Sequence, residues 1–211
     1  MRLLLAAAAL AVVNGQSAAE EECRREITSP VFTNATLRDA VARFFQDKGT
    51  AESTYGPMKC WDVSEVTDME GLFNERVDMS VTERTAQQAF NEPIEFWVVD
   101  KVTNMKDMFR FCTKFRQRLQ AWDPRRVTSM EGMFVQAVSF NQDLGWCLHS
   151  SVDLTAAFQG TMCEATSCGV DTQGSGTGSG ICPFPTPIPT PAPSISPVPT
   201  VTPWPTGAPS L

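Results

Sequence analysis

The stretch WDVSEVTDMEGLF, residues 61–73, returns twice along the chain with the same apolar positions. WVVDKVTNMKDMF occupies residues 97–109, and WDPRRVTSMEGMF occupies residues 122–134. The tryptophans that open these copies, with Trp146 opening a weaker fourth copy, are separated by 36, 25 and 24 residues. A recurring unit of this length predicts stacked repeats, because one unit cannot bury its apolar face alone.

We therefore predict an α/β repeat solenoid, in which each coil of about 25 residues holds a short parallel strand and a short helix. The strand is expected next to each tryptophan, for example at residues 94–97, 119–122 and 144–146. The helix is expected at the end of each copy, where Met and Phe recur at helical spacing. Equivalent side chains should then stack in columns, with methionines filling the core rather than binding metal. The columns are Trp61, Trp97, Trp122 and Trp146; Met69, Met105, Met130 and Leu154; Leu72, Met108, Met133 and Ala157; Phe73, Phe109, Phe134 and Phe158; and Phe90, Phe115 and Phe140.

A column of threonines accompanies the apolar columns. Thr67, Thr103 and Thr128 hold the same place in three copies. Hydroxyls at a turn either satisfy backbone groups or form a ladder of their own. Both arrangements are compatible with the sequence.

An amphipathic helix is predicted over residues 34–48, ahead of the first copy. Its apolar residues recur at i, i+3, i+4, i+7 and i+8, and Gly49 is expected to end it. Thr36 and Asp39 are expected to form a capping box. Since the end of a stack leaves apolar surface and unpaired backbone, this helix is interpreted as its N-terminal cap. The apolar residues are Leu37, Ala40, Val41, Phe44 and Phe45.

Four regions are predicted along the 211 residues: a signal peptide at 1–15, an N-terminal region at 23–60, the repeats with a Cys-rich cap at 61–170, and a tail at 171–211. Residues 1–13 combine Arg2 with an apolar run too short to span a bilayer. The tail holds a Gly/Ser linker and then eleven prolines among its last 29 residues, which predicts disordered, extended chain. It is either an extracellular stalk with glycosylated Thr and Ser or an unmodified disordered tail.

The combination of FNQDLGW, residues 140–146, with the pattern VTxMxxMF resembles the BspA-like leucine-rich-repeat proteins and the surface-protein repeat of bacterial lipoproteins. The resemblance covers roughly residues 30–160. It implies an extracellular repeat protein used in adhesion, and it implies no catalytic residue. Phe115-Arg116 departs from the usual Phe-Asn, and the first interval carries an insertion near residues 77–88.

The seven cysteines should be oxidised where possible, since a signal peptide directs the chain to an oxidising compartment. We expect a Cys23–Cys60 disulfide around the N-terminal cap. Cys112 is expected to be a buried free thiol, with an intermolecular disulfide as the alternative. Asn34 begins the N-x-S/T sequon and is a candidate glycosylation site. Two more disulfides are expected among Cys147, Cys163, Cys168 and Cys182.

Charge is distributed unevenly along a chain of net charge −7, a value that argues against nucleic-acid binding. Residues 52–100 carry eleven acids and three bases, whereas residues 101–126 carry eight bases and two acids. Either neighbouring copies neutralise one another, or the basic copy binds an anionic partner. The residues expected to bind such a partner are Lys114, Arg116, Arg118, Arg125 and Arg126.

No catalytic, cofactor or metal site is predicted. His149 is the single histidine, and no nucleophile motif surrounds it. The spacing of Cys163 and Cys168 does not suit a structural zinc site, and Asn141 and Asp143 do not make a calcium loop. We expect a secreted or cell-surface protein that recognises an extracellular protein or an anionic glycan. The alternatives are a structural wall or matrix component and, less favoured, an extracellular hydrolase.

Overall fold

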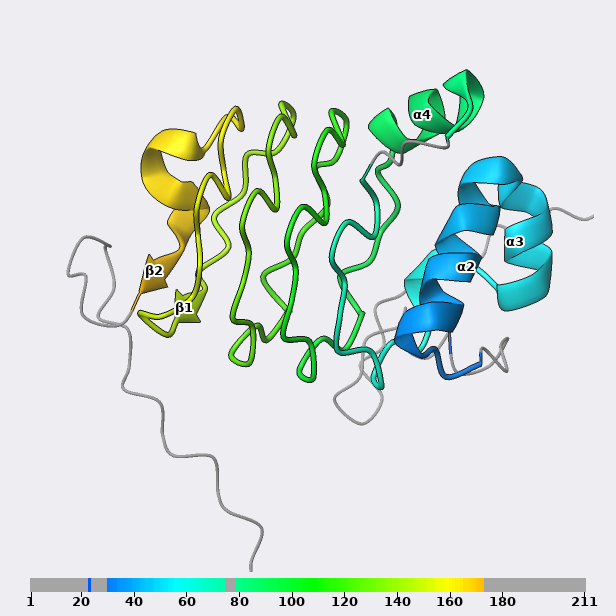
Figure 1. Cartoon of the computed structure of the whole chain (residues 1–211), viewed down its shortest axis with the longest axis horizontal. Helices are drawn as coiled ribbons and strands as arrows, with labels where there is room; N and C mark the ends of the chain where they lie inside the picture. The colour runs from blue at the N-terminus through cyan, green and yellow to red at the C-terminus, as the bar shows by residue number, and fades with distance from the viewer. Residues whose placement is uncertain (1–22, 24–29, 75–78, 173–211) are drawn as a thin grey trace, which may run out of the picture.

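The computed structural model of the chain describes residue 23, residues 30–74 and residues 79–172. The predicted signal peptide, most of the linker and the Pro-rich tail lie outside the described residues. The α-helices gather at one end, loops lie side by side in the middle, and a pair of strands with a short 3-10 helix lies at the other end (Figure 1). In chain order the elements are α2 (Asn34–Gln46), α3 (Lys48–Tyr55), η1 (Met58–Cys60), α4 (Val81–Gln88), β1 (Cys147–Leu148), η2 (Glu164–Gly169) and β2 (Asp171–Thr172).

Helix α2 is the helix predicted over residues 34–48, and all five of its predicted apolar residues are buried. Its capping box is formed by Thr33 and Thr36, so the predicted pairing of Thr36 with Asp39 is wrong. Gly49 does not end the helix either. Asp47 is both the C-cap of α2 and the N-cap of α3, where its carboxylate accepts from the Thr50 amide. The chain therefore turns one residue after α2 and starts a second helix.

The predicted fold class, an α/β repeat solenoid with a strand and a helix in every coil, is wrong. The described residues form a small domain of helices and loops whose only strands are β1 and β2, two residues each and parallel. Where the sequence predicted strands and helices inside the copies, the structure has turns and single parallel bridges, and β1 begins just after the strand expected at residues 144–146.

Left-handed residues explain why the helical spacing did not produce helices. Gly71, Asp107, Gly132 and Ala156 hold the same place in the four copies, and their φ angles are 58°, 51°, 62° and 54°. A helix cannot continue through a residue in this conformation. Each copy instead makes tight turns, such as the one closed by the Met108 amide on the Met105 carbonyl. Two successive turns bring Met and Phe inward as well as a helix would.

The backbone amides that a helix would have used locally donate to the next copy. Met69, Gly71 and Phe73 donate to the carbonyls of residues 104, 106 and 108 at 2.8 to 3.0 Å. The same pattern repeats from residues 105–109 to residues 129–133, and from residues 130–134 to residues 153–157. These bonds run in one direction, from the amides of one copy to the carbonyls of the following copy. We call this row the amide ladder.

Aromatic rings form the predicted columns beneath the ladder. Phe73, Phe109, Phe134 and Phe158 stack with centroid distances of 5.4, 5.2 and 5.9 Å. A second column, from Phe90 through Phe115 to Phe140, interlocks with the first, and Phe109 lies 4.2 Å from Phe115. The methionines of the predicted columns are also fully buried, which confirms their role as core.

Three tryptophans donate a hydrogen bond from the indole N–H to a backbone carbonyl in the preceding part of the chain. Trp97 Nε1 donates to the Met58 carbonyl, Trp122 Nε1 to the Ile94 carbonyl, and Trp146 Nε1 to the Leu119 carbonyl, at 2.9 to 3.3 Å. The threonine column satisfies backbone groups, the first of its two predicted roles. Thr103 and Thr128 donate their hydroxyls to the carbonyls of Thr67 and Thr103. The buried indole N–H groups of Trp97, Trp122 and Trp146 thus have partners, as burial requires.

Asn34 takes the place of a copy that would precede the first. In later copies the Thr103 and Thr128 amides donate to the carbonyls of Thr67 and Thr103. The Thr67 amide has no earlier copy to reach, and it donates at 2.9 Å to the side-chain oxygen of Asn34, which also accepts from Asp68. The Asn34 side-chain nitrogen donates to the Thr67 hydroxyl. The predicted glycosylation site is therefore also the residue that closes this end of the stack.

Replacing Asn34 by alanine should lower the free energy of unfolding by about 1–2 kcal/mol, because the Thr67 and Asp68 amides lose their acceptor. Asn34→Asp keeps an oxygen in place and should cost less than half as much. Urea unfolding of both variants, produced in a host that does not glycosylate, measures the difference. Equal losses for the two variants would contradict the acceptor role.

Candidate functional site

The eight bases of residues 101–126 divide into two groups of four. The first group is paired with acids. Lys101 lies 2.6 Å from Glu65, and Lys106 lies 2.5 Å from Glu131. The other two pairs are local. Arg110 pairs with Asp107, and Arg125 pairs with Asp123.

The pKa directions follow this pairing. The hydrogen bond to Glu131 raises the pKa of Lys106 above its ordinary value. The hydrogen bond from Arg125 lowers the pKa of Asp123. Lys101 and Lys106 pair across copies, at sequence separations of 36 and 25 residues. The expectation that neighbouring copies neutralise one another is met for these two bases, whereas Arg110 and Arg125 are neutralised within their own copy.

The second group consists of Lys114, Arg116, Arg118 and Arg126, all of them exposed. Within the described residues, no acid lies within ion-pair distance of their side chains. Three of the four belong to one short segment. We call Lys114, Arg116 and Arg118 the basic edge. Arg126 lies at the turn after Trp122, away from this segment along the chain.

The basic edge is positioned by the alternation of buried and exposed residues along its segment. Phe115 and Leu119 are fully buried, which directs the three basic residues between and beside them outward. Neighbouring copies fix the backbone on both sides. The Arg116 amide donates to Asn91 Oδ1 at 2.9 Å, and Gln142 Nε2 donates to the Arg116 carbonyl at 3.3 Å. The segment is therefore held in place while its charged groups remain free to bind.

The neighbouring copies place few acids beside the basic edge. One repeat earlier the equivalent residues are Ala89, Asn91 and Pro93, and one repeat later they are Ser139, Asn141 and Asp143. Asp143 is the one acid among them. Its carboxylate accepts from the Gly145 amide at 3.1 Å rather than from Arg118. Three like charges on one edge, without local neutralisation, can attract a polyanion.

Two of the predicted binding residues behave differently from the other three. Arg125 forms a bidentate contact with Asp123, so it is a weaker candidate than its exposure suggests. Arg126 is unpaired but separate from the basic edge along the chain. The structure does not place all five predicted residues on one segment.

A cleft of ≈ 990 Å³ lies between α2, α4 and the first copy. Arg38 crosses it, bonded to the Asp68 carboxylate and the Glu70 carbonyl. Acids outnumber bases in its lining, which includes Asp39, Asp68, Glu70 and Glu83. No group of three or more potential metal ligands occurs among the described residues. Sequence reasoning missed this cleft, because α4 comes from the insertion and its packing against α2 leaves no periodic signal.

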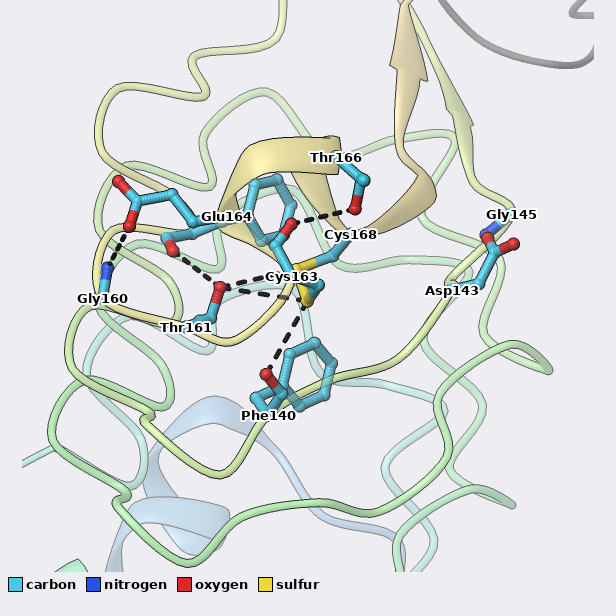
Figure 2. Close-up of a disulfide and its surroundings, with 10 residues drawn as sticks. Phe140, Asp143, Gly145, Gly160, Thr161, Cys163, Glu164, Thr166 and Cys168 are labelled. Carbon is cyan, nitrogen blue, oxygen red and sulfur yellow. Dashed lines mark hydrogen bonds between the residues drawn. A yellow bond between two sulfur atoms is a disulfide. The ribbon is translucent and has the colours of Figure 1, made fainter.

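The cysteines occupy three kinds of environment. Cys23 and Cys60 form a disulfide with Cα atoms 5.2 Å apart, which is the pairing expected. Cys163 and Cys168 form another across η2, with Cα atoms 4.8 Å apart. Figure 2 shows Thr161 and the Phe140 carbonyl beside this bond, and Glu164 accepting from the Gly160 amide. Cys147 is also disulfide-bonded, and Cys182 lies outside the described residues.

Cys112 is a fully buried free thiol, as predicted. Its sulfur accepts from Gln87 Nε2 at 3.4 Å and lies 3.5 Å from the Phe73 carbonyl. Burial raises the pKa of this thiol far above its ordinary value, so the thiolate needed for chemistry is not formed near neutral pH. An intermolecular disulfide through Cys112 would require the core to open.

His149 lies at an exposed turn, where its Nδ1 is 2.7 Å from the Ser151 hydroxyl. Nδ1 also accepts from the Ser151 amide at 3.2 Å, so this nitrogen serves the local turn. Among the described residues, no helix is both long and apolar enough to cross a bilayer.

The described residues thus define a small disulfide-bonded domain of helices and stacked loops with an exposed basic edge. The chain belongs to the family described as "Mycoplasma protein of unknown function, DUF285", which it matches over residues 39–168. No curated protein and no solved structure matches the chain. The family description carries no activity, so the resemblance to BspA-like proteins stays a prediction.

Thiol titration tests the cysteine assignment. The native protein should react with a thiol reagent only as fast as it opens, because Cys112 is buried and protonated at neutral pH. Unfolding without reductant should release one thiol per chain. A count of zero or three would contradict the assignment of Cys112 as the free cysteine.

Proposed function

We propose that the protein is a secreted or cell-surface protein that recognises an anionic extracellular glycan without catalysis. The basic edge is the contact surface, and Arg126 adds to the positive potential of the same copy. The single observation that supports this proposal is the division of the bases. Four of the eight are paired with acids, two of them across copies, while three of the remaining four lie on one fixed, exposed segment.

The negative net charge of the chain favours binding of a polyanion at one local site over its attraction to the whole surface. The whole chain carries a net charge of −7, so a polyanion is repelled by most of its surface. Binding then depends on a local patch whose potential exceeds that of its surroundings within a Debye length of about 8 Å. Sulfated glycans present closely spaced anions that suit arginines, which can donate two hydrogen bonds to one acidic group.

An extracellular location is part of the proposal, and the disulfides are compatible with it. Two disulfides among the described residues are typical of secreted and extracellular proteins, and uncommon in reducing compartments. The predicted signal peptide supports the same location. Bacterial surface repeats, which the motif resembles, also act outside the cell.

Removal of the basic edge should abolish most of the binding. The triple variant Lys114→Gln, Arg116→Gln and Arg118→Gln should lose about tenfold in heparin affinity, since each exposed contact contributes about 0.5 kcal/mol. Elution from a heparin column in a salt gradient, followed by calorimetric titration, gives the change. Urea unfolding of the variant should match that of the wild type, because these side chains are exposed and form no ion pair with the described residues.

A matched variant separates the position of the charges from their number. Lys101→Gln, Lys106→Gln and Arg125→Gln removes three bases from the same copy, but each of these is already neutralised by an acid. This variant should keep at least half of the heparin affinity. Equal losses in the two variants, or no retention of the wild type at physiological salt, would contradict the proposed site.

A further inference from the structure

The amide ladder has an open end in the fourth copy. In the first three copies, the amides at its three positions donate to the next copy. The equivalent amides of Leu154, Ala156 and Phe158 have no acceptor among the described residues. At the other end of the stack, Asn34 accepts from the Thr67 and Asp68 amides. The two ends of the stack therefore differ in whether their backbone amides have an acceptor.

The open end offers donors and no acceptors. The carbonyls of Leu154, Ala156 and Phe158 accept from the amides of residues 157, 159 and 161 in their own turns. The alternate carbonyls, of residues 155, 157 and 159, accept from the third copy. A segment that completes this end must supply carbonyl oxygens and needs no amide hydrogen of its own.

Two of the amides near these three donate hydrogen bonds to side chains. The Thr155 amide donates to the Asp153 carboxylate at 2.9 Å, and the Gly160 amide donates to the Glu164 carboxylate at 2.8 Å. The three residues line a shallow, open hollow of ≈ 390 Å³, together with Glu164 of η2. Phe158 is buried and Leu154 is half-buried, whereas Ala156 is exposed. Buried and half-buried amides are normally satisfied, so the unpaired amides of Leu154 and Phe158 indicate a missing partner.

The rest of the chain leaves from this end of the stack. Strand β2 pairs in parallel with β1, and both lie opposite the end that carries α2 and α3 (Figure 1). Cys147 in β1 is disulfide-bonded. With Cys23–Cys60, Cys163–Cys168 and the free Cys112 assigned, an intrachain bond from Cys147 uses Cys182, the last of the seven cysteines.

We propose that residues 183–193, PFPTPIPTPAP, dock along the open end and accept hydrogen bonds from Leu154, Ala156 and Phe158. Proline lacks an amide hydrogen, so this segment, with proline at every second position, is rich in carbonyls and poor in donors. A proline at every second position favours an extended chain, which would lower the entropy lost on docking. Eleven residues span about 34 Å at about 3.1 Å per residue, more than the five residues of the open end require.

Hydrogen exchange measured by NMR on the full chain tests this docking. The amides of Leu154, Ala156 and Phe158 should exchange at least about tenfold more slowly in the wild type than in a variant whose residues 183–193 are an equally long Gly/Ser sequence. The amides of Phe134 and Gln136 donate to the fourth copy and serve as internal controls. They should remain protected in both proteins.

Three results would overturn the proposal. The three amides could exchange at the rate of an unstructured peptide in the wild type, or they could be equally protected in the Gly/Ser variant. Protection that rises with protein concentration would assign the open end to a second copy of the chain. Protection that is independent of concentration and lost in the variant supports docking of residues 183–193.

Discussion

The backbone hydrogen bonds between copies are the constraint on which the rest of the structure depends. A left-handed residue in each copy prevents helix formation, and the released amides must find acceptors elsewhere. They find them in the following copy, so no copy can satisfy its backbone alone. Stacking of the aromatic columns follows from this geometry and adds burial to it. At one end of the stack the ladder amides have no following copy, and at the other end the Thr67 amide has no preceding copy, so each end needs its own solution.

Sequence spacing predicted which residues meet, but not the local structure that brings them together. The equivalence of Phe73, Phe109 and Phe134 follows from the copy length alone, and their rings are stacked. The same apolar spacing suggested helices, because it cannot distinguish one helical turn from two tight turns. The positive φ of Asp107 and Ala156 could not be predicted from the sequence, because non-glycine residues seldom adopt this conformation. The glycines at positions 71 and 132 were the available signal.

The candidate site shows a similar division. The exposed bases were identifiable from the sequence, whereas their pairing depends on which copies are neighbours. The repeat spacing predicts two of the ion pairs, because Glu65 and Lys101 are separated by one repeat, as are Lys106 and Glu131. Applied to Arg116, the same rule finds asparagine on both sides. For Arg125 it fails, because the pair with Asp123 forms within one turn. The proposed contact surface thus consists of bases that the stack leaves unneutralised.

The most direct test of the amide ladder is the detection by NMR of scalar couplings across its hydrogen bonds, which identify donor and acceptor together. The account predicts couplings from the Phe109 amide to the Met133 carbonyl and from the Gly132 amide to the Thr155 carbonyl. Couplings from the Phe109 amide to the carbonyl of Met105, four residues earlier, would show a helix in the second copy. That result would contradict the ladder and the packing derived from it.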